Sequence, residues 1–406
     1  MSAITFKVTH RHGSTRARVG ELRTLHGVVQ TPAFMPVGTY GVVRAVPAHI
    51  LKEIGADIML VNAYHLMLRP GLDLLGRHDG IHAFMGWKGP VLADSGGYQV
   101  FSLKDRVTIS PEGCTFRDTL AGDLHTLTPE AVVTFLQTAG LDIGMVLDVC
   151  PPPDAGDQDQ LRAMDLTKNW AERSINVWDP ERMGLFGIVQ GGGDLSRRER
   201  SASEIGSLGF SGHAIGGLGI GESPETTWSC VETCTGVLDE DRPRYLMGMG
   251  YPEDIERAVA LGVDLFDCVL PTRNARNGQL FTSSGRINLK QARHLDQTGP
   301  PDPQCACPTC RHYSLGYLSY LYRIKDMGAS ILSSIHNLWY YLDFMKRLRH
   351  TIAFNLPIGG NCEPAQCPGT TDAADSHSSG LLLHSHSTHA EEAETAPGLS
   401  EKSEKG

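Results

Sequence analysis

Seven short apolar runs recur along the chain, and each ends at a polar residue or beside a glycine. The runs end, in order, at Asn62, Asp94, Asp148, Gln190, Gly217, Met247 and Asp267. They lack the strict alternation of a strand with one wet face, and this is typical of parallel strands buried on both faces. Seven strand–helix units, with an eighth that the pattern does not locate, predict an α/β chain folded as a (β/α)8 TIM-type barrel.

The segments between the runs have helical character. In one of them, Thr128 can cap a helix whose first turn contains Pro129 and Glu130. In barrels of this type the active site lies at the carboxyl ends of the strands, where the ends of the runs would meet. A single polar strand end needs no explanation, but three carboxylates, an amide and two glycine pairs together favour a site.

Two of these acids suit chemistry at a sugar. Asp94 precedes a Ser-Gly-Gly turn and Tyr98, whose ring can stack on a planar base. Asp267 ends the last run and is followed by Arg273 and Arg276. Two carboxylates at one barrel mouth can break and remake a bond at an anomeric carbon, one as nucleophile and the other as acid and base. Arginines beside the nucleophile would hold the flanking phosphates of a polynucleotide.

Asp148 and Gln190 suit the recognition of a heterocycle. A carboxylate accepts hydrogen bonds from the ring N–H and the amino group of a guanine, and Gln190 can serve the carbonyl side with a backbone N–H near Gly217. Either residue could instead be a structural group whose hydrogen bonds are satisfied within the protein.

A cysteine cluster predicts a metal site. Cys305, Cys307 and Cys310 form a C-x-C-x-x-C motif, and His336 follows on an expected helix. Three thiolates and one imidazole complete a tetrahedral Zn²⁺ shell with no open position, which is typical of a structural metal. Free cysteines without metal are the alternative. The surrounding basic segment (residues 268–350) holds eleven Lys or Arg against four Asp, although the net charge of the whole chain is −10.

Composition suggests how the chain is divided. We expect residues 1–356 to form one catalytic barrel domain that includes the basic segment. From Glu363 onward the chain has eight acids against two lysines and little to bury, so we expect residues 357–406 to be a disordered polar tail. No run approaches the roughly 18 apolar residues of a membrane span, and the amino terminus lacks a signal-like apolar region. These features predict a cytoplasmic protein with no membrane partner.

The motifs that carry these residues resemble those of the tRNA-guanine transglycosylase family, especially its bacterial members. The matching stretches cover about residues 5–350 and stand in the order "FMPVGTYGVVRAV", "YHLMLRPG", "FMGWKGPVLADSGGYQVFSL", "GIVQGG", "AIGGL", "YLMGMG", "DCVLPTRNARNG", "CACPTC" and "HN". The resemblance implies queuosine biosynthesis: guanine at the wobble position of tRNA is exchanged for a 7-deazaguanine through a covalent aspartyl-ribosyl intermediate. It further implies binding of the tRNA anticodon loop with the target base out of its stack, one structural Zn²⁺ and a homodimer.

The resemblance also implies a role for each matching residue. Asp267 would be the nucleophile and Asp94 the general acid/base. The base would be bound by Asp148, Gln190, Gly217 and Leu218, and sandwiched by Tyr98 and Met247. Supporting residues would be Asn62 and Ser95, phosphate contacts Arg273 and Arg276, and zinc ligands Cys305, Cys307, Cys310 and His336.

Residues around the base-binding positions bear on the incoming base. Ile220 and Cys150 resemble the bacterial branch and favour 7-aminomethyl-7-deazaguanine over queuine. Val149 stands where bacterial members usually have glutamate, which leaves the exact incoming base open, and Glu222 is near enough in sequence to compensate.

Three tyrosines bear on assembly. Tyr313, Tyr317 and Tyr320 recur at helical spacing after the zinc cluster, where the family has interface aromatics. They could form such a dimer interface or an ordinary core face.

Three other functions fit less well. A noncatalytic tRNA-binding partner subunit would lack the catalytic acids, whereas Asp94 and Asp267 are both present. An archaeal relative that acts in the D-arm would carry large carboxyl-terminal RNA-binding domains. A sugar-hydrolysing barrel uses paired carboxylates but needs neither the two arginines nor a basic zinc-binding segment.

Overall fold

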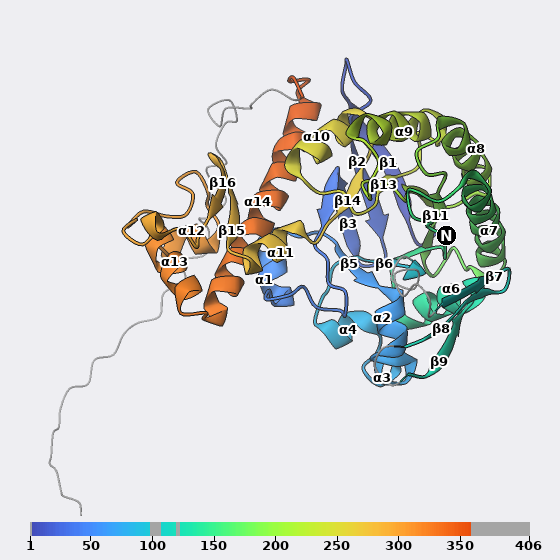
Figure 1. The fold of residues 1–406 in the computed structure, drawn as a ribbon, viewed down its shortest axis with the longest axis horizontal. Coiled ribbons are helices and arrows are strands. Elements are labelled where there is room, and N and C mark those ends of the chain that lie inside the picture. Colours follow the sequence, from blue (N-terminus) through green and yellow to red (C-terminus); the bar gives the residue numbers. More distant parts are fainter. Residues whose placement is uncertain (1, 98–106, 119–121, 359–406) are drawn as a thin grey trace, which may run out of the picture. The chain divides into compact units, whose positions relative to one another are not determined.

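The computed structural model describes residues 2–97, 107–118 and 122–358. Eight parallel strands follow one another in the order β4-β14-β13-β12-β11-β10-β6-β5. Their bounds are β4 Ala33–Met35, β5 Met59–Asn62, β6 Val91–Asp94, β10 Ile143–Met145, β11 Gly184–Val189, β12 Gly212–Ile215, β13 Arg244–Leu246 and β14 Leu265–Asp267. A parallel bridge between Val37 and Leu60 joins the two ends of this order, so the predicted barrel is confirmed (Figure 1).

The strand that the apolar pattern did not locate is β4. It has three residues, pairs in parallel with β14 and places Met35 opposite Asp267. Just beyond it, the N–H of Gly38 donates to the carbonyl of Leu60 (2.7 Å), which closes the ring against β5. A strand near the amino terminus therefore supports the strand that ends at Asp267.

The residues at which the seven apolar runs end do not all lie at the ends of strands in the structure. Asn62, Asp94 and Asp267 are the last residues of their strands. Asp148 and Gly217 lie in loops beyond β10 and β12, because the strand ladders end before the apolar runs do. The mouth of the barrel therefore combines strand ends with loop residues.

Helices surround the barrel (Figure 1). The longer ones are α6 Pro129–Ala139, α7 Asp157–Val177, α8 Leu195–Gly206, α9 Pro224–Val237 and α10 Pro252–Ala260, and the shorter ones are α1 Ala48–Glu53, α2 Ala63–Leu68, α3 Gly71–Arg77 and α4 Ile81–Met85. Helix α6 begins as predicted, because the Thr128 hydroxyl accepts a hydrogen bond from the N–H of Ala131 (3.1 Å). It ends at Gly140, whose φ of 81° suits glycine.

Two antiparallel sheets flank the barrel. One contains β1 Thr5–Arg11, β2 Arg18–Thr24 and β3 Gly27–Thr31, and the other β7 Val107–Ser110, β8 Gly113–Arg117 and β9 Leu124–Leu127. The first is tied to the barrel by Arg18, which donates two hydrogen bonds to the buried carboxylate of Asp264 (2.9 and 2.6 Å). Because Asp264 precedes β14, this ion pair lies at the end of the strand away from Asp267.

The basic segment follows β14. Its elements are α11 Leu270–Arg276, β15 Gln279–Thr282, β16 Gly285–Asn288, the 3₁₀ helix η2 Ala292–His294, α12 Pro308–His312, α13 Leu315–Arg323 and α14 Met327–Ala353. The first half of α14 carries His336, and its second half packs on the barrel, where the ring of Tyr341 lies 4.8 Å from that of Phe34. Arg349 also donates to the carbonyl of Pro32 (2.8 Å). One helix therefore belongs to both the basic segment and the barrel.

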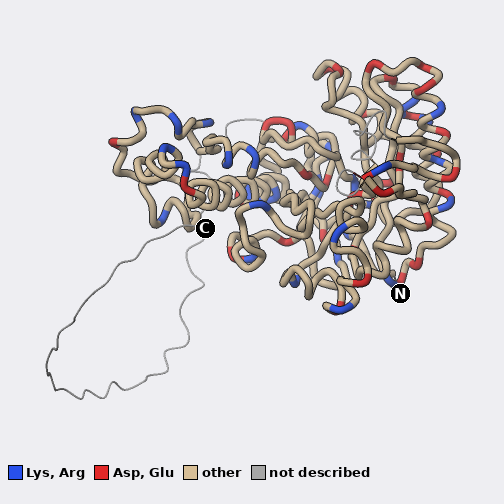
Figure 2. The backbone as a smooth tube through the Cα atoms, turned by 60° about the horizontal axis from the view of Figure 1, so that its bottom comes forward, with Lys and Arg blue, Asp and Glu red and all other residues tan. Residues whose placement is uncertain are grey.

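The charge distribution follows the sequence. Figure 2 shows Lys and Arg predominating along the part of the chain that forms α11 to α14. No helix among the described residues is long and apolar enough to cross a bilayer. Of the expected tail, residues 359–406 lie outside the described residues.

Candidate active site and metal centre

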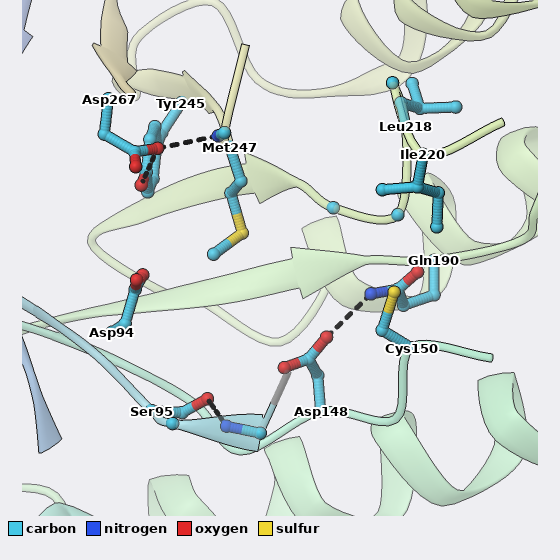
Figure 3. Close-up of a pocket in the computed structure, with 16 residues that line it drawn as sticks. Asp94, Ser95, Asp148, Cys150, Gln190, Leu218, Ile220, Tyr245, Met247 and Asp267 are labelled. Atoms are coloured by element: carbon cyan, nitrogen blue, oxygen red, sulfur yellow. Dashed lines mark hydrogen bonds between the residues drawn. The ribbon is translucent and has the colours of Figure 1, made fainter. Parts of the chain in front are cut away.

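A cavity of about 270 Å³ opens at the carboxyl ends of the strands. The predicted residues that line it are Asp94, Ser95, Asp148, Gln190, Gly217, Leu218, Met247 and Asp267. Figure 3 shows Asp94 and Asp267 at one side of the cavity and Asp148 with Gln190 at the other, with Met247 between them. Tyr98 lies outside the described residues. The structure therefore brings residues far apart in sequence to one cavity, with Asp94 and Asp267 on one side and the Asp148–Gln190 pair on the other.

Asp267 is held by two donors. The hydroxyl of Tyr245 and the N–H of Gly248 both donate to its Oδ1, at 2.6 and 2.7 Å. Burial raises the pKa of Asp267, and these two hydrogen bonds oppose that shift because they favour the charged carboxylate. Burial and the nearby carboxylates raise the pKa of Tyr245 well above its usual value, so this hydroxyl remains a donor.

Asp94 has the opposite environment. Its Oδ1 is buried without a hydrogen-bond partner among the described residues. Burial, followed by repulsion from Asp267 and Asp148, raises the pKa of Asp94 well above its usual range. Asp94 therefore holds a proton under conditions where Asp267 is more readily charged.

The two residues predicted to support Asp94 are both its neighbours: Asn62 on the adjacent strand and Ser95 next along the chain. Asn62 on β5 stands opposite Asp94 on β6. The Asn62 side chain accepts a hydrogen bond from the N–H of His65 (3.3 Å) and so caps α2. Ser95 accepts from the N–H of Gly97 (3.2 Å), and its hydrogen bond to Asp148 helps to lower the pKa of that acid. The two residues thus position the loops on either side of Asp94.

Asp148 and Gln190 form a buried pair. The amide nitrogen of Gln190 donates to Oδ2 of Asp148 (2.6 Å). Burial raises the pKa of Asp148 to about 6, against the effect of hydrogen bonds from Gln190 and Ser95. An amide nitrogen has two N–H donors, so one is left for a ligand.

A glycine loop forms the wall beside this pair. Gly217 has a φ of 65°, and a Cβ there would lie 2.5 Å from Oε1 of Gln190. Only glycine therefore lets the loop approach Gln190 this closely. Further along, Glu222 accepts hydrogen bonds from the N–H groups of Gly219 (2.5 Å) and Ile220 (3.2 Å), so its carboxylate holds its own loop.

The residues expected to influence base choice lie on the loops after β10 and β12 and line two neighbouring pockets. Ile220 and Cys150 line the cavity. Val149 is buried and lines a neighbouring pocket with Val107 and Ile109. Val149 therefore faces the pocket beside the β7 sheet, and it is absent from the lining of the cavity that Asp148 helps to form.

The two predicted phosphate-binding arginines lie on α11, directly after the strand that ends at Asp267. Arg273 is exposed, and Arg276 is partly buried. Burial, followed by the nearby charge of Arg44, lowers the pKa of Arg276. Arg44 is exposed on the loop before α1 and thus adds a third cation, which sequence order did not reveal.

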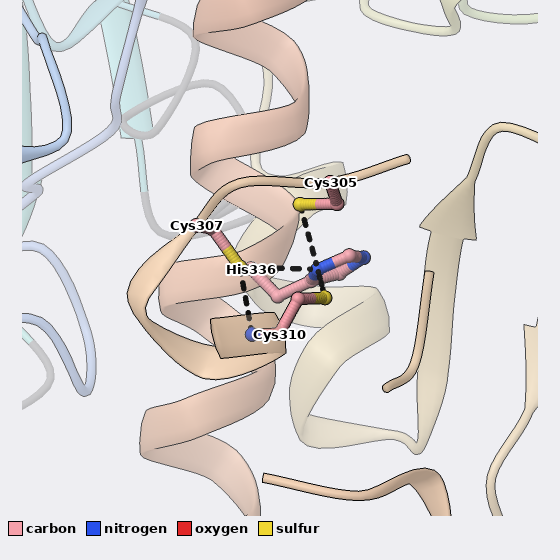
Figure 4. A group of neighbouring side chains, drawn as sticks. All are labelled: Cys305, Cys307, Cys310 and His336. Atoms are coloured by element: carbon pink, nitrogen blue, oxygen red, sulfur yellow. Dashed lines mark hydrogen bonds between the residues drawn. The ribbon is translucent and has the colours of Figure 1, made fainter. Parts of the chain in front are cut away.

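The predicted metal ligands converge, as Figure 4 shows. The Sγ atoms of Cys305, Cys307 and Cys310 lie 3.6, 3.5 and 3.3 Å from Nδ1 of His336. Nε2 of His336 donates to the carbonyl of Phe281 on β15 (2.8 Å), which leaves Nδ1 free as a ligand atom. Three sulfur atoms and one nitrogen around a common centre can hold a metal ion, and this donor set fits zinc.

Two residues important to the cavity were missed at the sequence level. Tyr245 lies two residues before the predicted Met247, and its alternation along β13 is the only signal that it shares the cavity. Arg198 is fully buried beneath the glycine loop, although its stretch "LSRRERS" looks like a solvated helix face. Helical periodicity alone gave no sign of its burial.

Comparison with known proteins places these motifs in one family. The family model described as Queuine tRNA-ribosyltransferase matches residues 13–355. A protein of this name from Novosphingobium aromaticivorans is 45% identical over 358 residues, covering 87% of this chain and 95% of the relative. Proteins of the same name from Desulfosudis oleivorans and Nitrosomonas europaea are 47% and 48% identical, covering 86% and 83% of this chain and 92% and 91% of the relatives. The chain therefore belongs to the queuine tRNA-ribosyltransferase family.

Proposed function

We propose that this chain is a tRNA-guanine transglycosylase of queuosine biosynthesis, which exchanges guanine at the wobble position of tRNA for a 7-deazaguanine. Membership of the family supports the activity. The observation that carries the chemistry is the contrast between two acids at one cavity. Asp267 accepts hydrogen bonds that favour its charge, whereas Oδ1 of Asp94 is buried without a partner among the described residues. Such a contrast separates a nucleophile from a general acid.

In the first half-reaction, a carboxylate oxygen of Asp267 attacks C1′ of the target nucleoside and the bond between C1′ and N9 breaks. The electron pair of that bond passes to N9, which takes the proton of Asp94. Guanine leaves as a neutral base, and the ribose is held as an ester of Asp267. The phosphodiester strand is not cut at any point.

In the second half-reaction, the 7-deazaguanine gives its N9 proton to the Asp94 carboxylate. N9 then attacks C1′, the ester bond breaks, and Asp267 regains its negative charge. Protons and charges therefore balance over the cycle, and no cofactor takes part in the exchange.

The base would be read from the far side of the cavity. Asp148 in its charged form accepts from the ring N–H and amino group, while the free N–H of Gln190 and a backbone N–H of the glycine loop donate to the carbonyl. Ile220 and Cys150 limit the space beside the loop. This favours 7-aminomethyl-7-deazaguanine as the incoming base, with queuine as the alternative.

The proposed RNA partner is the anticodon loop of tRNA with its target base out of the stack. Arg273 and Arg276 lie on α11, directly after the strand that ends at Asp267, and Arg44 lies near Arg276. The three arginines would hold phosphates on either side of the target. We propose that the enzyme acts in the cytoplasm, where its tRNA substrate is found.

The Cys305, Cys307, Cys310 and His336 cluster would hold one structural Zn²⁺, because all four donors are protein atoms and none is left for a substrate.

The proposed assembly is a homodimer. Tyr313 stacks on Tyr317 at 5.5 Å, and Tyr317 and Tyr320 are 44% and 50% exposed, so the stripe is open to a partner rather than part of the core.

Replacement of Asp267 tests the proposed function. We expect Asp267→Ala to abolish incorporation of radiolabelled guanine into tRNA and to prevent the RNA–protein adduct on a denaturing gel, because the attacking oxygen is gone. Asp165→Asn, an exposed acid on α7, should behave as wild type. Incorporation by Asp267→Ala at the wild-type rate would refute Asp267 as nucleophile. Absence of incorporation by the wild type with a range of tRNAs would refute the function itself.

A further inference from the structure

Arg198 on α8 makes an unusual set of contacts directly beneath the cavity. Its side chain is fully buried. Nε donates to the carbonyl of Gly192 (2.8 Å), Nη1 to those of Val189 (3.2 Å) and Gly216 (2.8 Å), and Nη2 to that of Gly217 (3.1 Å). No carboxylate of the described residues pairs with this guanidinium, so a buried cation is surrounded by backbone carbonyl groups.

These contacts orient two peptide groups at the cavity wall. In a trans peptide the C=O and the following N–H point in opposite directions. Because Arg198 holds the carbonyls of Gly216 and Gly217, the N–H groups of Gly217 and Leu218 point away from the guanidinium. Both residues line the cavity, and neither N–H has a hydrogen-bond partner among the described residues.

The same helix also fixes the neighbouring reading residue. Ser201, one turn after Arg198 on α8, accepts a hydrogen bond from the N–H of Gln190 (3.1 Å). Both residues are buried, so one face of α8 holds the backbone of the loops after β11 and β12.

We propose that Arg198 is a positioning residue that holds the N–H groups of Gly217 and Leu218 as a donor pair for the exocyclic oxygen of the departing base. This inference rests on the proposed function and adds a residue to it. When the C1′–N9 bond breaks, its electron pair passes to N9 and is spread over the ring onto that oxygen until Asp94 delivers its proton. Donors already aimed at the oxygen stabilise this charge without reorganisation. The unpaired guanidinium behind the peptides strengthens their donor ends.

The test uses Arg198→Lys and Arg198→Met, with Arg200→Lys and Arg200→Met as matched controls. Lysine keeps the charge but has one nitrogen, so it cannot reach four carbonyls at once. Arg200 is on the same helix, exposed, and pairs with Asp165 and Glu204. In guanine exchange, Arg198→Lys should lower kcat by about tenfold or more with a smaller change in KM for guanine, as expected when oxyanion donors lose their alignment. The Arg200 variants should retain both constants.

A second readout separates positioning from general destabilisation. 2-Aminopurine lacks the exocyclic oxygen. Its inhibition constant should therefore change less between the wild type and Arg198→Lys than the dissociation constant of guanine does. In the wild type, addition of guanine should shift the amide resonances of Gly217 and Leu218, and this measurement holds even if the variants fail to fold. Wild-type kcat in folded Arg198→Lys, or unmoved amide resonances, would overturn the proposal. Because the wild type remains active in that case, the proposed function would stand.

Discussion

The three acids of the cavity differ because their immediate neighbours differ. Asp267 receives two hydrogen bonds at one oxygen, Asp94 has a buried oxygen without a described partner, and Asp148 is bonded to the Gln190 amide. Burial raises the pKa of all three. Hydrogen bonds oppose this shift at Asp267 and Asp148, whereas repulsion from these two acids adds to it at Asp94. The same residue type therefore offers three different environments, which suit the proposed nucleophile, the proposed acid and the proposed base-reading group.

Asp148 predicts how exchange depends on pH. Its pKa is raised to about 6, so the carboxylate is charged above this pH and takes up a proton below it. A protonated carboxyl group cannot accept from both donors of the base. The kcat/KM for guanine should therefore fall by up to about tenfold per pH unit below pH 6, measured by radiolabelled incorporation between pH 5 and 8.

The control is Asp148→Asn, which cannot titrate. Its residual exchange should not show the fall in kcat/KM below pH 6 that protonation of Asp148 causes. Its KM for guanine should be much higher than that of the wild type. A wild-type profile that stays flat down to pH 5 would show that Asp148 is not the group that reads the base in its charged form.

Sequence reasoning located the acids but not the groups that tune them. Asp94 and Asp267 stand at the ends of apolar runs within long motifs, so their placement at one mouth followed from the barrel. Tyr245 and Arg198 act through contacts across neighbouring strands and loops, and such contacts depend on how the barrel closes. Glu222 is near enough in sequence to compensate for the glutamate missing at Val149, but its carboxylate holds the amides of its own loop.

At the level of elements, the apolar pattern predicted seven strands, including three-residue strands such as β10 and β14, and did not locate β4. Strand β4 lies between Pro32 and Pro36, which interrupt its apolar run, and it is recognisable through its pairing with β14 and the bridge to β5 just beyond it. Helix α6 was predictable from Thr128, Pro129 and Glu130, because capping is a local interaction. The two roles of α14, in the basic segment and against the barrel, were not predictable, because they arise from packing between residues distant in sequence.

The metal centre predicts a local loss of structure when the ion is removed. Three thiolates so close together repel one another without a cation, and metal binding therefore contributes to folding. Chelation should reduce hydrogen-exchange protection in β15, β16 and α12 while the barrel strands stay protected. Hydrogen exchange followed by mass spectrometry measures both regions in one experiment.

A cysteine outside the cluster serves as the control. Cys307→Ser should show the same local loss without chelator, whereas Cys230→Ser, a buried thiol on α9, should keep full protection in the basic segment. Unchanged protection in β15 and β16 after complete metal removal would rule out a structural role for the ion.

At the scale of the whole molecule, the exposed tyrosines predict self-association. A charge placed in a buried apolar interface is costly, so Tyr317→Arg with Tyr320→Arg should convert a dimer into a monomer. Light scattering after size-exclusion chromatography measures the particle mass. Leu25→Arg replaces another exposed apolar side chain, 60% exposed and on a different part of the surface, and should leave the mass unchanged. A wild-type mass of one chain at micromolar concentration would contradict the proposed dimer.

The net charge of the molecule conceals the basic segment, because acids elsewhere in the chain, including those of the tail, outnumber its positive charges. The eleven Lys or Arg against four Asp in residues 268–350 mark this segment in the sequence alone. A count of charges along the sequence does not reveal that Arg44 lies near Arg276. The two residues approach each other only when β4 and β14, the first and last strands of the barrel, pair.

That pairing has a consequence for biosynthesis on the ribosome. Of the eight barrel strands, β14, which ends at Asp267, is synthesised last and must pair with β4, which is synthesised first. Until then the nascent sheet has two open edges, and no amino-terminal fragment shorter than this point can possess the active centre. Every turnover of the finished enzyme thus depends on a contact that forms only after 267 of the 406 residues have been joined.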